Sequence, residues 1–246
     1  MAISVELIPR DKEILANELQ QIKDNTFPID LINIPELLRF ETHSWEGAKL
    51  AQEHGFKAMP HIRALDINLN DKLPMQEYLH SHKINDVLVI TGDPPQSMAH
   101  KVYPTISTDI IRKFHDEMPE INVYAGIDQY RSSMRQELYH IRRKIQAGAC
   151  GFFTQPFFDL RYMEMYAEML EGSNIYWGIS PVLSERSVSY WETKNNVVFP
   201  KDFEPTLEWN IEFARKVRDF VTKHNSNMYI MPIRADLVEY MQGIFA

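Results

Sequence analysis

The sequence is poor in cysteine and has no long apolar run. Among its 246 residues Cys150 is the single cysteine, so it can form no disulfide within the chain and cannot by itself build a thiolate metal cluster. No apolar run approaches the roughly 18 residues that a membrane helix needs. The N-terminal segment MAISVELIPRDKE also lacks the apolar core and cleavage site of a signal peptide. We therefore expect a cytoplasmic protein with no membrane association and no metal site.

Basic side chains are outnumbered, and several motifs of common enzyme classes are missing. The 26 basic and 34 acidic side chains give a formal charge of −8, which repels a phosphate backbone, so we expect no nucleic-acid partner. The sequence contains no GxxxxGK[ST] loop, GxGxxG turn, GxSxG elbow or HExxH helix. Nucleoside-triphosphate, Rossmann, serine-hydrolase and zincin functions therefore lack their defining residues.

What the sequence does contain is a regular alternation of short apolar runs with longer amphipathic stretches. This order is typical of repeated βα units around parallel strands. The predicted strands begin at Ile3, Ile29, Ala58, Asp86, Asn122, Gly151, Ile175 and Met228. Eight such units predict a single α/β domain over residues 1–246, a (β/α)8 TIM barrel, in preference to a doubly wound open sheet. One insertion is predicted after the seventh strand, at about residues 183–208.

Enzymes with this fold place their chemistry at the carboxyl ends of the strands, so polar residues there are candidates for a site. Glu6 lies in an otherwise apolar first strand, where burial would raise its pKa toward that of a general acid. An equally weighted alternative is a structural ion pair of Glu6 with Arg63 or Arg234.

Two further strand ends present polar side chains. Asp93 follows Gly92 in a loop stiffened by two prolines, which is either a fixed carboxylate at the rim or an ordinary turn. Gln155 precedes Phe157 and Phe158, an arrangement that suits a flat heterocycle but also describes a polar strand end above a core cluster.

The segments VELIP, PHIRALD, DVLVITGDPP, RRKIQAGACGFFTQPFFD and PIRAD, which span most of the chain, resemble the methylenetetrahydrofolate reductase family. The resemblance implies an FAD-containing (β/α)8 barrel that reduces 5,10-methylenetetrahydrofolate to 5-methyltetrahydrofolate, with NADH or NADPH supplying hydride through the flavin. It also implies a place in one-carbon metabolism and methionine biosynthesis. The chain is short for this family, and we expect no N-terminal extension or regulatory domain.

The resemblance implies roles for four residues that touch the folate. Glu6 matches the general acid that protonates a folate nitrogen and opens the imidazolidine ring to an iminium. Asp93 matches the aspartate that contacts the pterin and stabilises the cation, and Gln155 matches an amide that contacts the pterin or the nicotinamide. Arg234 matches an arginine that meets the glutamate tail, a role suited to a guanidinium.

The resemblance also implies a flavin site. Its expected residues are His61, Gly92, Asp93, Tyr103, Glu137, Arg143, Lys144 and Ala149, with Arg143 and Lys144 facing the diphosphate. The sequence departs from the family at Thr91, where the family has arginine, at Gly126, where it has tyrosine, and at Tyr130, where it has histidine. Asn33-Ile34-Pro35-Glu36 likewise replaces a Thr-Tyr-Gly-Ala pattern.

These departures define two alternatives to the flavin-dependent reductase. The first is a folate reductase that takes hydride directly from a nicotinamide or a deazaflavin. The second is a non-catalytic folate-binding partner of a methyltransferase or of a reductase complex. We expect folate and a nicotinamide as small-molecule partners, and either self-association or a complex with a methyltransferase or reductase subunit.

Overall fold

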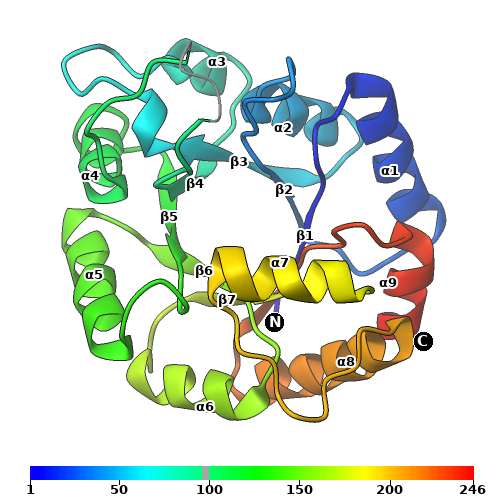
Figure 1. Ribbon diagram of the computed structural model, residues 1–246. Coiled ribbons are helices and arrows are strands. Elements are labelled where there is room, and N and C mark those ends of the chain that lie inside the picture. The colour runs from blue at the N-terminus through cyan, green and yellow to red at the C-terminus, as the bar shows by residue number, and fades with distance from the viewer. Residues whose placement is uncertain (96–99) are drawn as a thin grey trace.

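The computed structural model describes residues 1–95 and 100–246, and within them eight parallel strands close into one barrel in sequence order (Figure 1). The strands are β1 (Ile3–Glu6), β2 (Leu31–Ile34), β3 (Lys57–Arg63), β4 (Asp86–Ile90), β5 (Asn122–Ile127), β6 (Gly151–Pro156), β7 (Ile175–Ile179) and β8 (Asn227–Ile230). Closure is made by β8, which pairs with β1 in the register Ser4 to Tyr229. The prediction of a (β/α)8 barrel is confirmed.

Helices surround the barrel as an outer ring, except for α7, which crosses in front of the barrel (Figure 1). They are α1 (Lys12–Asp24), α2 (Ser44–Glu53), α3 (Gln76–Ser81), α4 (Ser107–Glu117), α5 (Met134–Ala147), α6 (Leu160–Met169), α7 (Glu185–Asn195), α8 (Leu207–Lys223) and α9 (Leu237–Phe245), with a short 3-10 helix at Ala64–Asp66. Within the described residues, none of them is long and apolar enough to cross a membrane.

Local sequence explains where these helices begin and end. The side chain of Ser133 accepts a hydrogen bond from the Gln136 amide at the start of α5, satisfying one of the free N–H groups there. Gly148 ends the same helix with a φ of +115°, a conformation that glycine adopts without strain. In α1, Leu15, Leu19 and Ile22 recur at helical spacing and are buried.

The strands separate two apolar layers, because successive side chains point to opposite faces of the sheet. Outward-facing residues such as Val5 and Ile32 pack under the helices. The barrel interior holds a second cluster that consists of Leu31, Met59, Leu88, Phe153, Tyr176, Tyr229 and Met231. The rings of Phe153 and Tyr176 stack there with centroids 4.2 Å apart, so the interior is packed rather than open.

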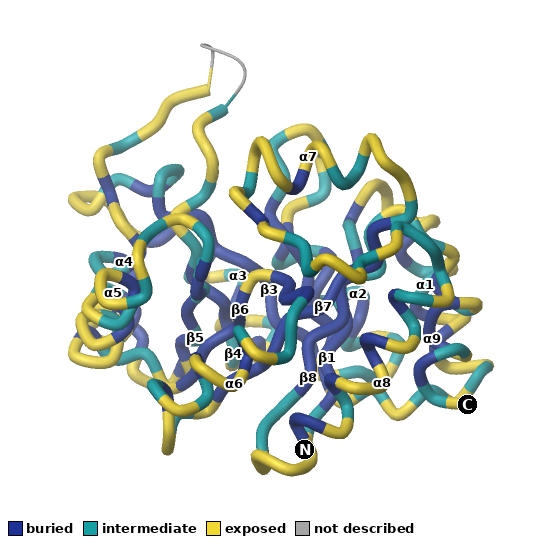
Figure 2. Tube along the Cα trace, turned by 60° about the horizontal axis from the view of Figure 1, so that its bottom comes forward, coloured by how far each residue is buried: buried dark blue, intermediate teal, exposed yellow. Residues whose placement is uncertain are grey.

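A third apolar cluster lies over the carboxyl ends of the later strands. Trp191 of α7 packs there with Phe158 and Val182, which directly follow β6 and β7. Figure 1 shows α7 crossing in front of the barrel, and Figure 2 shows it at the same end of the molecule as the loop after β4. The segment between β7 and α8, which contains α7, therefore covers part of the barrel mouth.

Candidate active site

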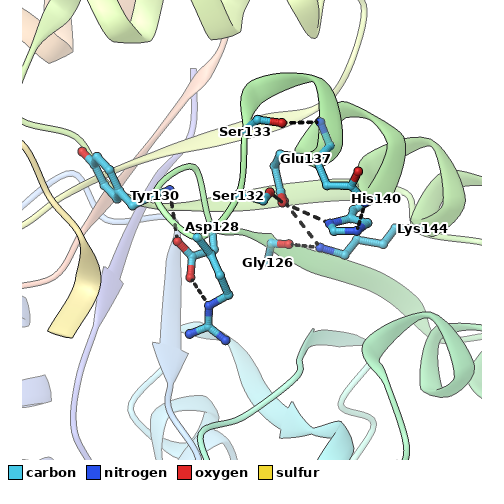
Figure 3. Close-up of polar contacts among 10 residues, drawn as sticks. Gly126, Asp128, Tyr130, Ser132, Ser133, Glu137, His140 and Lys144 are labelled. Atoms are coloured by element: carbon cyan, nitrogen blue, oxygen red, sulfur yellow. Dashed lines mark hydrogen bonds and ion pairs between the residues drawn. The ribbon is translucent and has the colours of Figure 1, made fainter.

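Most of the residues expected to form a site lie at the mouth of the barrel, on the carboxyl ends of strands or just beyond them, whereas Ala149 precedes β6, at the amino end of that strand. Glu6, His61 and Gln155 lie at or near the ends of β1, β3 and β6. Asp93 follows β4, and Arg234 follows β8. Glu137 and Lys144 reach the same region from α5 (Figure 3). The fold thus unites positions that are far apart in the sequence.

Glu6 is a largely buried carboxyl group in the wall of the barrel, with 13% of its side chain exposed. Its Oε2 accepts a hydrogen bond from the hydroxyl of Tyr229 and lies 4.0 Å from Nε2 of His61. Burial raises the pKa of Glu6 to about 7, and the Tyr229 hydrogen bond opposes that rise in part. Glu6 therefore carries its proton in a large fraction of molecules at neutral pH, as a general acid must.

The two arginines considered as ion-pair partners of Glu6 are engaged elsewhere or exposed. The Arg63 guanidinium donates to Asp66 Oδ2 at 2.9 Å and to the Asp93 carbonyl at 2.7 Å. Arg234 is exposed and has a φ of +59°. Among the described residues, the hydrogen-bond partner of Glu6 is a phenol rather than a cation.

His61 is held in a chain of polar groups that crosses the barrel interior. Its Nε2 lies 3.0 Å from Oδ1 of Asn33, and the Asn33 amide nitrogen donates to Oγ of Ser4. The Ser4 hydroxyl in turn donates to the Leu31 carbonyl at 3.2 Å. Burial lowers the pKa of His61 to about 3, so the ring is neutral at physiological pH.

The sequence analysis did not predict this series of polar groups, although the spacing of residues on β1 gave one signal of it. Ser4 and Glu6 are two residues apart on β1, so their side chains share the inward face. Asn33 pairs with Glu6 in the β1–β2 register, and Tyr229 pairs with Ser4 in the β1–β8 register. Only the registers of a closed barrel bring these four polar side chains together.

Arg63 holds the residues just after β4, Gly92 and Asp93. Gly92 has a φ of +86°, and an added Cβ would stand 3.2 Å from the Arg63 guanidinium carbon, so glycine permits both the backbone turn and the close contact. The adjacent Asp93 carboxylate is 84% exposed and lies 3.5 Å from the Arg131 guanidinium. Arg63 thus places a guanidinium beside Gly92, next to Thr91, the position at which the resembled family has arginine.

Glu137 and Lys144 form a buried charged pair below the end of β5 (Figure 3). The Lys144 ammonium donates to the Gly126 carbonyl at 2.6 Å and lies 3.9 Å from Glu137. Burial lowers the pKa of Lys144, and the Glu137 carboxylate opposes that effect. Glu137 also lies 3.4 Å from His140 Nδ1 and accepts a hydrogen bond from Ser132.

Arg143 lies apart from this pair. It is exposed, and its guanidinium carbon is 6.0 Å from the centroid of the Tyr139 ring, which is itself 56% exposed. The structure therefore does not bring Arg143 and Lys144 together.

Gln155 presents an exposed side chain at the end of β6, while its backbone carbonyl accepts a hydrogen bond from Gln129 at 2.8 Å. Phe157 and Phe158 are buried in the core and in the cluster beneath α7, where they contribute to packing. Tyr130 is also structural here, because its hydroxyl donates to the Pro156 carbonyl at 3.0 Å.

Tyr103 and Ala149 are half-buried. The Tyr103 amide donates to the Leu65 carbonyl at 2.9 Å, and the Lys101 ammonium lies 5.0 Å from the centroid of its ring. The Ala149 amide donates to the Lys144 carbonyl at 3.0 Å, just after the glycine that ends α5.

A pocket of about 330 Å³ opens beside Glu6, between α1 and the β8–α9 loop. Its charged lining residues are Glu6, Arg10, Glu18, Arg234 and Asp236. The pocket can therefore accept a polar ligand that reaches the buried acid.

Comparison with known proteins finds a matching family over most of the chain. The family model described as methylenetetrahydrofolate reductase matches residues 40–230. The 5,10-methylenetetrahydrofolate reductase of Buchnera aphidicola subsp. Schizaphis graminum is 22% identical over 158 residues, covering 62% of this chain and 54% of that protein. That of Escherichia coli K12 is 25% identical over 168 residues, covering 66% and 56%. The chain thus spans about half the length of the curated relatives that it matches.

Solved structures support the fold. The crystal structure of 2,3-dimethylmalate lyase aligns with a TM-score of 0.60 at 9% identity, covering 96% of this chain and 76% of that chain. Glu6 and Arg234 lie outside the range of the family match, so the case for them rests on the geometry described above.

Proposed function

Because the chain belongs to the methylenetetrahydrofolate reductase family, we propose that it reduces 5,10-methylenetetrahydrofolate to 5-methyltetrahydrofolate, with hydride from NADH or NADPH through bound FAD. The observation that carries this proposal is Glu6, a carboxyl group at the barrel mouth that borders a pocket and has a pKa of about 7. A general acid is most effective when its pKa lies close to the working pH.

In this proposal Glu6 donates its proton to a nitrogen of the folate imidazolidine ring. The ring then opens at the bridging carbon, which becomes an electrophilic iminium able to accept hydride. The proton is available because the buried environment disfavours the carboxylate, and Tyr229 fixes the carboxyl group by its hydrogen bond.

The other residues expected at the folate support binding and charge stabilisation. The exposed carboxylate of Asp93 offers a negative charge for the cationic intermediate, and its loop is held by the Arg63 hydrogen bond to its carbonyl. Gln155 offers an exposed amide for the pterin or the nicotinamide. Arg234 lines the pocket beside Glu6 and suits the carboxylates of the glutamate tail.

Several polar groups at the mouth are suited to a flavin. Oε1 of Gln129 and Oγ of Ser180, which follow β5 and β7, are buried without a hydrogen-bond partner in the described part of the chain. A ring system with N–H and C=O groups would satisfy them. The residues that would hold FAD are His61, Gly92, Asp93, Tyr103, Glu137 and Lys144. Arg143 would join them only if its side chain turned away from Tyr139, and Ala149, which precedes β6, lies at the opposite end of the barrel. When bound, FAD supplies the hydride carrier between nicotinamide and folate.

One observation favours a second candidate, in which hydride passes to the folate directly from a nicotinamide or a deazaflavin. The Lys144 ammonium is already bound by the Gly126 carbonyl and Glu137, and Arg143 lies against Tyr139. The two cations expected at the flavin diphosphate are therefore both engaged otherwise. Glu6 keeps the same role in this candidate.

The experiment that separates the candidates is the visible absorbance of the protein purified without added cofactor, followed by anaerobic addition of NADH and then NADPH. The proposal predicts a bound flavin that one donor bleaches, together with formation of 5-methyltetrahydrofolate. A colourless chain that takes up no FAD but still turns over folate supports the second candidate. A chain that binds folate but does not reduce it with any hydride donor would overturn both candidates and leave the non-catalytic partner role.

A further inference from the structure

We propose that Asn33 is a positioning residue for acid catalysis: its amide oxygen fixes His61, which burial keeps neutral, as the tautomer protonated at Nε2 and engages that N–H group, so that it does not pair with Glu6. This inference rests on the proposed function for its catalytic meaning, but its structural content can be measured separately. It is argued from three hydrogen bonds and from the 4.0 Å distance between Nε2 of His61 and Oε2 of Glu6.

The direction of the hydrogen bonds follows from the Leu31 carbonyl, where the series of polar groups begins. The Leu31 carbonyl can only accept, so the Ser4 hydroxyl donates to it at 3.2 Å. Ser4 Oγ is then left to accept, and its partner must be the Asn33 NH₂ group. This orientation turns Oδ1 of Asn33 toward His61.

The orientation of Asn33 fixes the tautomer of His61. An amide oxygen accepts and cannot donate, so Nε2 of His61 must carry the hydrogen at the 3.0 Å contact. A neutral imidazole has one N–H group, and Nδ1 is therefore bare. His61 is 5% exposed, so a second proton would create a buried cation.

Such a cation would act directly on Glu6. Nε2 of His61 lies 4.0 Å from Oε2 of Glu6, a separation at which an opposite charge strongly favours the carboxylate. With His61 neutral, the groups next to Glu6 are the Tyr229 phenol, the Asn33 amide and a neutral imidazole. None of these carries a charge, so burial dominates and Glu6 keeps its proton.

The charged groups on neighbouring elements are largely matched by partners of their own. Glu18 of α1 pairs with Arg10 of the preceding loop at 3.1 Å. At the end of β3, Arg63 pairs with Asp66 at 2.9 Å. Before α2, the Glu36 carboxylate lies 2.8 Å from His43. Arg234 and Asp236 line the pocket from the β8–α9 loop. His61 is therefore the group whose charge state most directly controls Glu6.

The test uses the full chain and two substitutions at one position. Asn33→Leu has nearly the same shape but accepts no hydrogen bond, so Nε2–H of His61 is left with Glu6 as its nearest acceptor and an ion pair can form. Asn33→Asp places a carboxylate on Nε2–H and stabilises the imidazolium. Met59→Leu is the matched control, since it is a volume-conserving change in the barrel interior on the same strand as His61.

The first readout is nitrogen NMR of histidine-labelled protein between pH 5 and pH 8. We expect His61 to remain neutral and protonated at Nε2 in the wild type and in Met59→Leu, and to become an imidazolium within this range in both Asn33 variants. The second readout is the pH dependence of folate reduction. Its high-pH limb should move to lower pH by about one unit or more in Asn33→Leu, and less in Asn33→Asp, because the added carboxylate opposes the effect of the imidazolium on Glu6.

Each outcome decides the question. Protonation of wild-type His61 at Nδ1, or titration of His61 that is the same in the wild type and both Asn33 variants, would overturn the inference. So would a high-pH limb of folate reduction that does not move in an active Asn33→Leu variant. If the chain proves to have no reductase activity, the NMR result still tests the hydrogen-bond arrangement, and if Asn33→Leu does not fold, Asn33→Asp and the wild-type tautomer remain as tests.

Discussion

The hydroxyl of Tyr229 donates a hydrogen bond to the carboxyl group of Glu6 across the seam at which β8 pairs with β1. The two residues are 223 positions apart in the sequence. Closure of the barrel thus completes the environment of its buried acid. Removal of water by burial raises the pKa of Glu6, and the phenol moderates that rise.

Tyr229→Phe should therefore shift the activity of the enzyme toward higher pH. The Tyr229 hydrogen bond lowers the pKa of Glu6, so its loss raises that pKa and preserves the acid form at higher pH. A hydrogen bond to a charged group contributes about 1.5 kcal/mol, which corresponds to about one pH unit. The measurement is the high-pH limb of the rate of folate reduction. Tyr240→Phe, at another buried phenol, is the control, and a limb that moves to lower pH in Tyr229→Phe contradicts this account.

Glu6→Gln should become more stable relative to the wild type as pH rises. The folded-state pKa of Glu6 lies above its ordinary value of 4.5, so the unfolded chain releases this proton first, and stability is lost between about pH 4.5 and about pH 7. A rise of that size corresponds to about 3 kcal/mol, which glutamine does not incur because it has no charge to bury.

Urea unfolding of both proteins at pH 5 and pH 8 measures this difference. From pH 5 to pH 8, the free energy of unfolding of Glu6→Gln should rise by up to about 3 kcal/mol relative to that of the wild type. The exposed substitution Glu164→Gln should show no such gain. A constant difference between Glu6→Gln and the wild type would show that Glu6 is ionised in the folded protein throughout.

Gly92→Ala should cost more stability than Gly55→Ala. Both glycines have a positive φ, +86° and +89°, so alanine incurs about 1 kcal/mol of backbone strain at either position. At Gly55 an added Cβ meets nothing within 4 Å, whereas at Gly92 it stands 3.2 Å from Arg63. Displacement of Arg63 should add about 1 kcal/mol or more and raise the KM for folate, because Arg63 holds the Asp93 carbonyl. Equal unfolding free energies for the two variants would exclude this role of Arg63.

Trp191→Ala should loosen α7 without unfolding the barrel. Trp191 is 8% exposed and packs in the cluster with Phe158, Val182 and Val197, apart from the core under the other helices. Loss of a buried tryptophan costs about 3 kcal/mol, enough to raise amide hydrogen exchange in α7 about a hundredfold. Exchange in the strands should stay unchanged. Tyr190→Ala, at a neighbouring side chain that is 58% exposed, should leave exchange in α7 close to the wild-type rate.

The strands and most of the helices could be predicted because each βα unit carries its own signals. Ser133 and Gly148, for instance, mark the two ends of α5 in the sequence itself. The position of Glu6 at the end of an apolar strand also indicated a buried acid. These features depend on neighbours in the sequence, where hydrophobic period and cap residues are informative.

The partners of Glu6 could not be predicted in the same way. The contacts of Tyr229, His61 and Asn33 depend on strand registers, which the sequence pattern alone does not define. The same holds for Arg63, which was considered as a partner of Glu6 but bonds to Asp66 and the Asp93 carbonyl instead. The position of Arg143 against Tyr139 depends on a side-chain direction within α5, which residue spacing did not resolve.

The measurement that tests the central claim most directly is anaerobic formation of 5-methyltetrahydrofolate by the wild type and by Glu6→Gln, with FAD and with NADH or NADPH present. The account predicts product from the wild type and almost none from Glu6→Gln, while both proteins bleach a bound flavin at similar rates when the donor is added. Product formation by Glu6→Gln at the wild-type rate would contradict the assignment of Glu6 as the acid of this barrel.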